Sequence, residues 1–177
     1  MSLRIVVVVL AIGACLALAA PLRAAGEKGK PAYLFAQTAK NAEIAASSGG
    51  TWTLRLSGAD LDTIWFTDRP ARDMGRIGKE EFVKNWNSGE DPFGRDPPNA
   101  AVELRDASGK TSVVTVTLVS MSQDGGDLVY RIRPLDAKDL GLALQGRAGQ
   151  ALKEIPEGTF LSPVVFMDFD ESKGFGF

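Results

Sequence analysis

Apolar residues that recur at every second position are the feature of this chain that most restricts its fold. Between Thr51 and Ser57, the residues Trp52, Leu54 and Leu56 alternate with polar ones, which is typical of a strand with one buried face. Further segments rich in β-forming residues are bounded by turn residues. They are 33–36, 63–67, 101–105, 111–119, 128–132 and 163–167. About seven short strands separated by turns indicate an all-β domain.

The connections between these segments favour antiparallel pairing. Glycine-containing loops at 106–110 and 122–126 join consecutive segments, as in β-hairpins. One helix is predicted over 79–86, where three apolar residues share one face. The sequence therefore predicts a mainly antiparallel β-sandwich of about seven strands with one short helix. A partly open barrel is the alternative.

The N-terminal residues 1–24 have the layout of a bacterial signal peptide. Arg4 precedes a long apolar run, and small residues follow that run. We expect cleavage after Ala19 or Ala24, which leaves 25–177 as one β-rich domain with a short acidic C-terminal tail. The predicted location is the periplasm or the exterior of the cell.

Cys15 is the only cysteine, it lies inside the predicted signal peptide, and the chain has no histidine. A processed chain would therefore lack disulfides, zinc and copper sites of the usual kind, and catalysis by cysteine or histidine. No haem or nucleotide motif is present. The membrane is expected as a partner only through the export signal or, as an alternative, through a lipid on Cys15, because 12–15 resembles a lipobox.

The formal net charge of −2 argues against nucleic acid as a partner. An enzyme is the least supported class, since no spacing of carboxylates or serines identifies a hydrolase. The prediction is therefore a binding protein without enzymatic activity.

Three arginines and two aspartates lie within the nine positions 68–76. Arginine presents a planar fork of donors that suits carboxylates and phosphates. Trp65 lies opposite its neighbours Ile64 and Phe66 in register, and we expect it to be the exposed member of the three. The candidate surface for a protein or an anionic ligand comprises Trp65, Arg69, Arg72 and Arg76. The alternative is that these arginines pair with carboxylates or cover apolar surface.

The same region resembles a family of uncharacterised exported bacterial proteins. The resemblance rests on Phe66-Thr67-Asp68-Arg69-Pro70, which is similar to an "FSDRP" strand end, and on the "DPPNA" loop from Asp96 to Ala100. It implies a shared β-rich fold and export for most of the chain after the signal peptide. It implies no activity.

Oxygen ligands occur at alternate positions near the C-terminus. Asp168, Asp170 and Ser172 resemble the opening of a calcium-binding loop, with Glu171 between them. Lys173 stands where such a loop needs glycine, so the segment is not an EF-hand. It would form a partial site for a hard cation, calcium or a lanthanide, and a metal with few protein ligands could bridge two copies.

Other acidic loops are alternative cation sites. They contain Glu90, Asp91 and Asp96 in one loop and Asp60 and Asp62 in another. The leading hypothesis is a periplasmic protein that binds calcium or a lanthanide through surface carboxylates. The alternative is a metal-free interaction module that uses the turn at 68–76 to contact another exported protein or an anionic ligand. The sequence assigns no role to 137–154.

Overall fold

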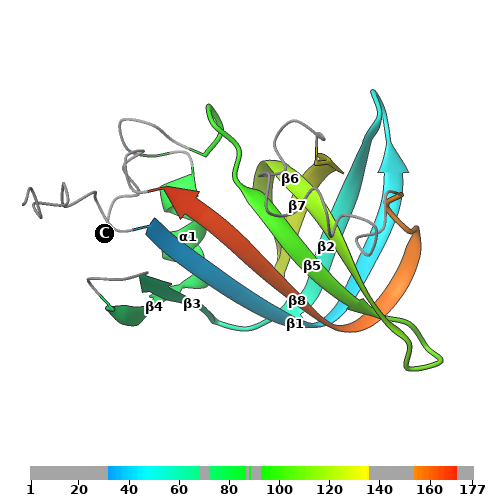
Figure 1. Cartoon of the computed structure of the whole chain (residues 1–177), viewed down its shortest axis with the longest axis horizontal. Helices are drawn as coiled ribbons and strands as arrows, with labels where there is room; N and C mark the ends of the chain where they lie inside the picture. The colour runs from blue at the N-terminus through cyan, green and yellow to red at the C-terminus, as the bar shows by residue number, and fades with distance from the viewer. Residues whose placement is uncertain (1–31, 68–71, 87, 89–92, 136–153, 171–177) are drawn as a thin grey trace, which may run out of the picture.

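The computed structural model describes residues 32–67, 72–86, 88, 93–135 and 154–170, which form eight strands and one helix (Figure 1). The elements are β1 (Ala32–Ser47), β2 (Thr51–Ala59), β3 (Asp62–Thr67), β4 (Met74–Gly78), α1 (Lys79–Trp86), β5 (Asn99–Arg105), β6 (Thr111–Asp124), β7 (Asp127–Pro134) and β8 (Gly158–Asp170). The predicted class, mainly antiparallel β with one short helix, is confirmed.

All eight strands belong to one sheet, and this sheet is partly ring-like. The strand order is β2-β7-β6-β5-β8-β1-β3-β4, and β2 also pairs with β1. Every pairing is antiparallel. One curled sheet therefore takes the place of two stacked sheets, and its concave face encloses the core.

The sheet divides where β1 changes partners along one edge. Residues 39–47 of β1 pair with β2, whereas residues 33–36 pair with β3. Only Asp60 and Leu61 separate β2 from β3, and the Asp60 N–H donates to the carbonyl of Thr38 at 3.0 Å. From this point β2 pairs with β7 and so belongs to the ring, while β3 pairs with β4, which forms the edge of the sheet.

Helix α1 packs its apolar side against the inner face of both branches. Phe82 and Trp86 are buried. The Phe82 ring lies 5.6 Å from that of Phe35 in β1, and the Trp86 ring lies 5.7 Å from that of Tyr130 in β7. Burying a side chain of this size stabilises a fold by about 2–3 kcal/mol. The helix is therefore held in place mainly by these two aromatic residues.

Several element boundaries differ from the expected ones. The helix matches, but β1 continues to Ser47 through an alanine-rich stretch without clear alternation. β4 begins within the arginine-rich segment 68–76, which was expected to be a turn. β8 extends to Asp170, so the first residues of the predicted acidic tail belong to a strand.

Some predictions fall on other parts of the chain. The predicted signal peptide, 1–24, and nearly all of 137–154 lie outside the described residues. Within the described residues, no helix has the length and apolar character required to cross a membrane.

Candidate contact surface

The candidate site is the convex side of four neighbouring strands, β4, β3, β1 and β8. Successive side chains of a strand point to opposite faces. In the first part of β1, which pairs with β3, Phe35 and Gln37 are buried and face the core, so Leu34 and Ala36 point outward.

The outward residues form two rows across the four strands, because the strands pair in a continuous register. One row is Met74, Phe66, Leu34 and Asp168, and the other is Arg76, Ile64, Ala36 and Phe166. Cross-strand neighbours lie about 4.5–5.5 Å apart, so the two rows form one continuous surface. We call these eight residues the outer face.

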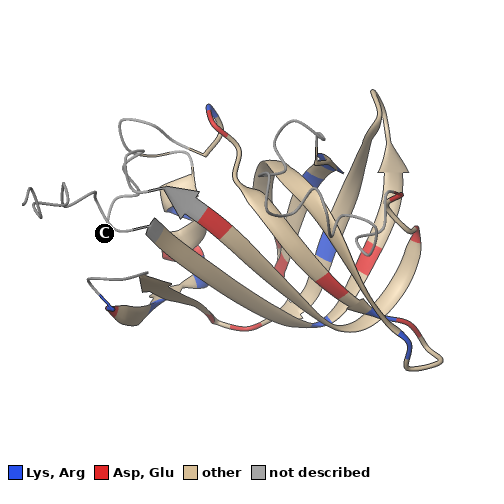
Figure 2. Cartoon of the chain, in the orientation of Figure 1, with Lys and Arg blue, Asp and Glu red and all other residues tan. Residues whose placement is uncertain are grey.

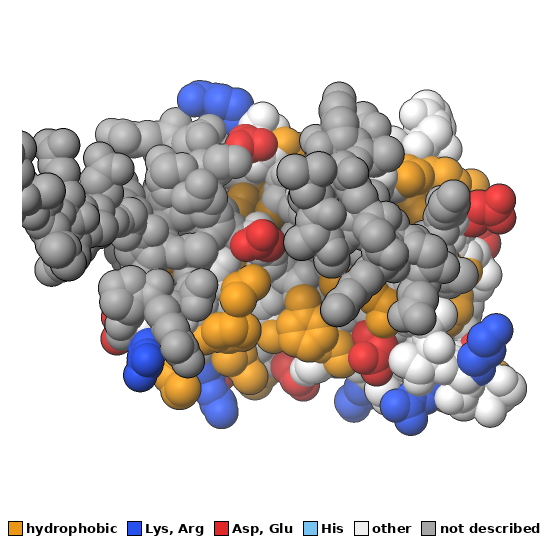
Figure 3. Space-filling model, in the orientation of Figure 1, with side chains coloured by type: hydrophobic (Ala, Val, Ile, Leu, Met, Phe, Trp, Pro, Cys, Tyr) orange, Lys and Arg blue, Asp and Glu red, His pale blue; other side chains and the backbone are white. Residues whose placement is uncertain are grey.

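Large apolar side chains of the outer face are unusually exposed. The exposed fraction is 80% for Met74, 49% for Ile64, 45% for Phe166 and 38% for Phe66. Figure 3 shows hydrophobic side chains gathered over β3, β1 and β8 on this side of the molecule. A single exposed apolar residue needs no explanation, but a contiguous group is typical of a contact surface.

The inward side of β3 explains why its apolar residues face solvent. Thr63 and Thr67 are buried, and each has a hydrogen-bond partner. The Gln37 Nε2 donates to Thr63 Oγ1 at 2.9 Å, and the Asp73 N–H donates to Thr67 Oγ1 at 2.8 Å. Buried hydroxyls are tolerated when they are bonded in this way. The threonines therefore take the inner side, and Ile64 and Phe66 are left outside.

Trp65 shares the inner side with these threonines, which differs from the expected exposed position. It is half-buried, and its ring lies 5.6 Å from that of Tyr33. Gly75 is its cross-strand partner in β4, and a Cβ on Gly75 would lie only 2.6 Å from the indole. Trp65 thus covers the glycine, and it is Ile64 and Phe66 that form the exposed surface.

Basic residues border the outer face on the β4 side (Figure 2). The Arg76 guanidinium lies 3.7 Å from the Asp62 carboxylate, and 73% of the Arg76 side chain is exposed. Arg72 is exposed and has a φ of 58°. Exposed ion pairs of this kind contribute little to stability, so Arg76 can exchange its partner at small cost. Arg69, the third arginine of the predicted surface, lies outside the described residues.

The predicted cation ligands are only partly described. Asp168 is exposed on β8, where it belongs to the outer face. Asp170 is the last residue of β8. The Asp170 side chain, Glu171 and Ser172 lie outside the described residues.

Of the alternative acidic loops, the structure describes Asp60, Asp62 and Asp96. Asp60 accepts a hydrogen bond from the Thr38 hydroxyl, and Asp62 lies beside Arg76. Asp96 is exposed, whereas Glu90 and Asp91 lie outside the described residues. In the part of the chain that the structure describes, no three carboxylates gather where they could hold a metal ion.

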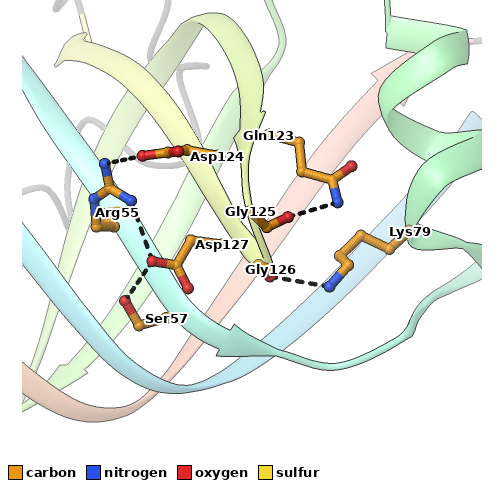
Figure 4. A network of polar contacts seen from close by, with 8 residues as sticks. All are labelled: Arg55, Ser57, Lys79, Gln123, Asp124, Gly125, Gly126 and Asp127. Atoms are coloured by element: carbon orange, nitrogen blue, oxygen red, sulfur yellow. Dashed lines mark hydrogen bonds and ion pairs between the residues drawn. The ribbon is translucent and has the colours of Figure 1, made fainter.

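A network of charged residues joins the β6–β7 turn to β2 (Figure 4). Arg55 of β2 donates to Asp124 at 2.8 Å and to Asp127 at 3.1 Å, and Ser57 donates to Asp127 at 3.0 Å. The Arg55 guanidinium, with a smaller contribution from Ser57, lowers the pKa of Asp127 below its usual value. These two carboxylates are therefore occupied in joining β2 to the β6–β7 hairpin.

Lys79 connects the same turn to the helix and to the point where the sheet divides. Its N–H donates to the Leu61 carbonyl at 2.7 Å, and its Nζ donates to the Gly126 carbonyl at 3.0 Å. Only 7% of the residue is exposed. Sequence reasoning missed this role, because a lysine at the start of a helix gives no signal that it is buried.

Comparison with protein-family models, with characterised proteins and with solved structures found no match. The resemblance to a family of exported bacterial proteins therefore stays a prediction.

Proposed function

We propose that this chain is a non-enzymatic interaction module of the periplasm, which binds a protein partner through the outer face. The observation that carries the proposal is the group of exposed apolar side chains on β4, β3, β1 and β8, led by Met74, Ile64 and Phe166. Such a group lowers the solubility of the protein when it faces water, and its burial against a partner contributes favourable free energy to binding.

The arrangement suits a protein better than a small molecule. The outer face is a sheet surface that presents several large side chains side by side, and charged residues stand only at its border. An apolar centre with a polar rim is the usual anatomy of a protein–protein interface. Of the predicted arginine-rich surface, Arg72 and Arg76 belong to this rim, while Trp65 supports the sheet from the inner side.

Binding of a hard cation stays a prediction of the sequence. Asp168 is exposed as that hypothesis requires, but an exposed carboxylate on a strand is also compatible with a polar rim. Cation binding is therefore the second candidate function.

Site-specific photo-cross-linking in the exporting cell tests the proposal. A benzophenone side chain replaces Ile64 on the outer face, and a matched control replaces Arg131, an exposed residue that points outward from β7. We expect one discrete cross-linked product from position 64 and none from position 131. Equal products from both positions, or none from position 64, would contradict the proposal.

A further inference from the structure

We propose that the partner bound by the outer face is a second copy of this chain. This inference rests on the proposed function, because it names the partner of the same surface. It is carried by the distribution of charge across that surface together with its exposed apolar centre.

Exposed arginines stand on one side of the outer face, and carboxylates stand on the other. On the β4 side stand the exposed guanidinium groups of Arg72 and Arg76. On the β8 side stands the exposed carboxylate of Asp168, and Glu103 points outward from β5, the next strand. Asp62 and Asp73 lie near the arginines, but the Asp62–Arg76 pair is long at 3.7 Å and exposed to solvent.

A two-fold axis would make this surface complementary to itself. We consider an axis that runs parallel to the strands and lies between two stacked outer faces. Rotation about it reverses the order of the strands, so β4 of one copy faces β8 of the other. Arg76 of each copy then approaches Asp168 of its partner, and this contact forms twice. The same rotation places Ile64 and Phe66 of one copy over the apolar centre of the other.

A membrane surface fits the charge pattern less well. Peripheral membrane proteins surround inserted apolar residues with lysine and arginine, which attract anionic lipids. Here Asp168, Glu103 and Asp62 border the same apolar group, and they would be repelled by such lipids. A surface with both signs matches a copy of itself, because each sign finds its opposite there.

Sedimentation equilibrium of the purified protein measures the association directly. The outer face has eight residues, whereas a standard interface has about 20–30 per partner, so we expect a dissociation constant in the micromolar range or weaker. The mass should rise from one chain toward two as concentration increases. Met74→Lys, at a side chain that is 80% exposed and so perturbs the fold little, should weaken association at least tenfold.

Charge reversal identifies the docking geometry. Arg76→Asp and Asp168→Arg should each weaken association at least tenfold, and the double variant should recover most of the loss. Arg131→Asp, an exposed change on β7 away from the outer face, should have no effect. Failure of the double variant to recover association would overturn the proposed two-fold arrangement.

Further outcomes separate this inference from the proposed function. A protein that stays monomeric at all concentrations overturns the second-copy inference. If the protein is monomeric and position 64 still cross-links to another protein, the proposed function stands with a different partner. If the protein is monomeric and position 64 forms no cross-link, the inference and the proposed function are both wrong. Association that is lost in EDTA would overturn the inference in favour of a metal bridge between two copies. Binding of the monomer to anionic vesicles would overturn it in favour of a lipid surface.

Discussion

Replacing Tyr130 by phenylalanine tests whether a buried polar chain supports the ring of strands. The Tyr130 hydroxyl donates to Gln37 Oε1 at 2.5 Å, and Gln37 in turn donates to Thr63. Tyr130 is fully buried, and Gln37 is only 3% exposed. The variant leaves the Gln37 carbonyl without this donor in a place that water does not reach. Such a loss costs about 1–3 kcal/mol.

The stability that the Tyr130→Phe variant loses should become smaller as the pH rises above about 10. Burial raises the pKa of Tyr130 above its usual value, while the hydrogen bond to Gln37 opposes this effect more weakly. In the unfolded chain the phenol loses its proton near pH 10. The native protein then binds more protons than the unfolded one, so its stability falls by about 1.4 kcal/mol per pH unit above that value. The stability contributed by the tyrosine is thus present below pH 10 and is lost above it.

Urea unfolding followed by circular dichroism at pH 7 and at pH 11 measures both effects. At pH 7 the Tyr130→Phe variant should be less stable by about 1–3 kcal/mol. At pH 11 the gap should shrink by about 1.4 kcal/mol, because phenylalanine has no proton to lose. A variant as stable as the parent at pH 7, or a gap that is unchanged at pH 11, would refute the reasoning.

Three further predictions concern the network, the helix and the cation. Asp127→Asn should lower the urea midpoint at pH 7 and lower it less at pH 3; the contribution of Asp127 is present above about pH 4 and is lost as pH falls through its lowered pKa. An equal loss at both pH values would contradict this. Phe82→Ala should cost about 3–5 kcal/mol in the same assay, and a cost below 1 kcal/mol would show that α1 is not held by its aromatic face. If the cation hypothesis is right, terbium luminescence should saturate and be lost in the double variant Asp168→Asn, Asp170→Asn; luminescence that persists would move the site elsewhere.

The sequence predicted the parts of the fold that depend on local pattern. The helix at 79–86 and the strands with clear alternation were correct, because both signals reflect burial of one face. The alanine-rich half of β1 was missed, since alanine fits either face of a strand. β4 was missed because its short run is mostly glycine and charged residues.

The candidate surface could not be read from the sequence, and the segment 63–67 shows why. Its alternation is clear, but alternation alone does not say which side faces the core. Hydropathy favours Ile64 and Phe66 inside, whereas the structure buries two threonines because Gln37 and Asp73 satisfy their hydroxyls. Gln37 lies 26 positions from Thr63 in the sequence, and Asp73 lies 6 positions from Thr67, so no local pattern reveals these partners.

The identification of the outer face as a contact surface has a direct test in the methionines of the chain. Met74 is 80% exposed on that face, whereas Met121 and Met167 are buried, at 8% and 0%. A brief hydroxyl-radical pulse is applied to cells that export the protein and, separately, to the purified protein at high dilution. Leu161, 44% exposed near the start of β8, serves as the internal standard.

We expect the oxidation of Met74, relative to Leu161, to be several-fold lower in the cell than at high dilution. Met121 and Met167 should stay unoxidised in both samples, which shows that the fold is intact. Equal oxidation of Met74 in the cell and at high dilution would mean that the outer face is not covered, and it would contradict the proposed function.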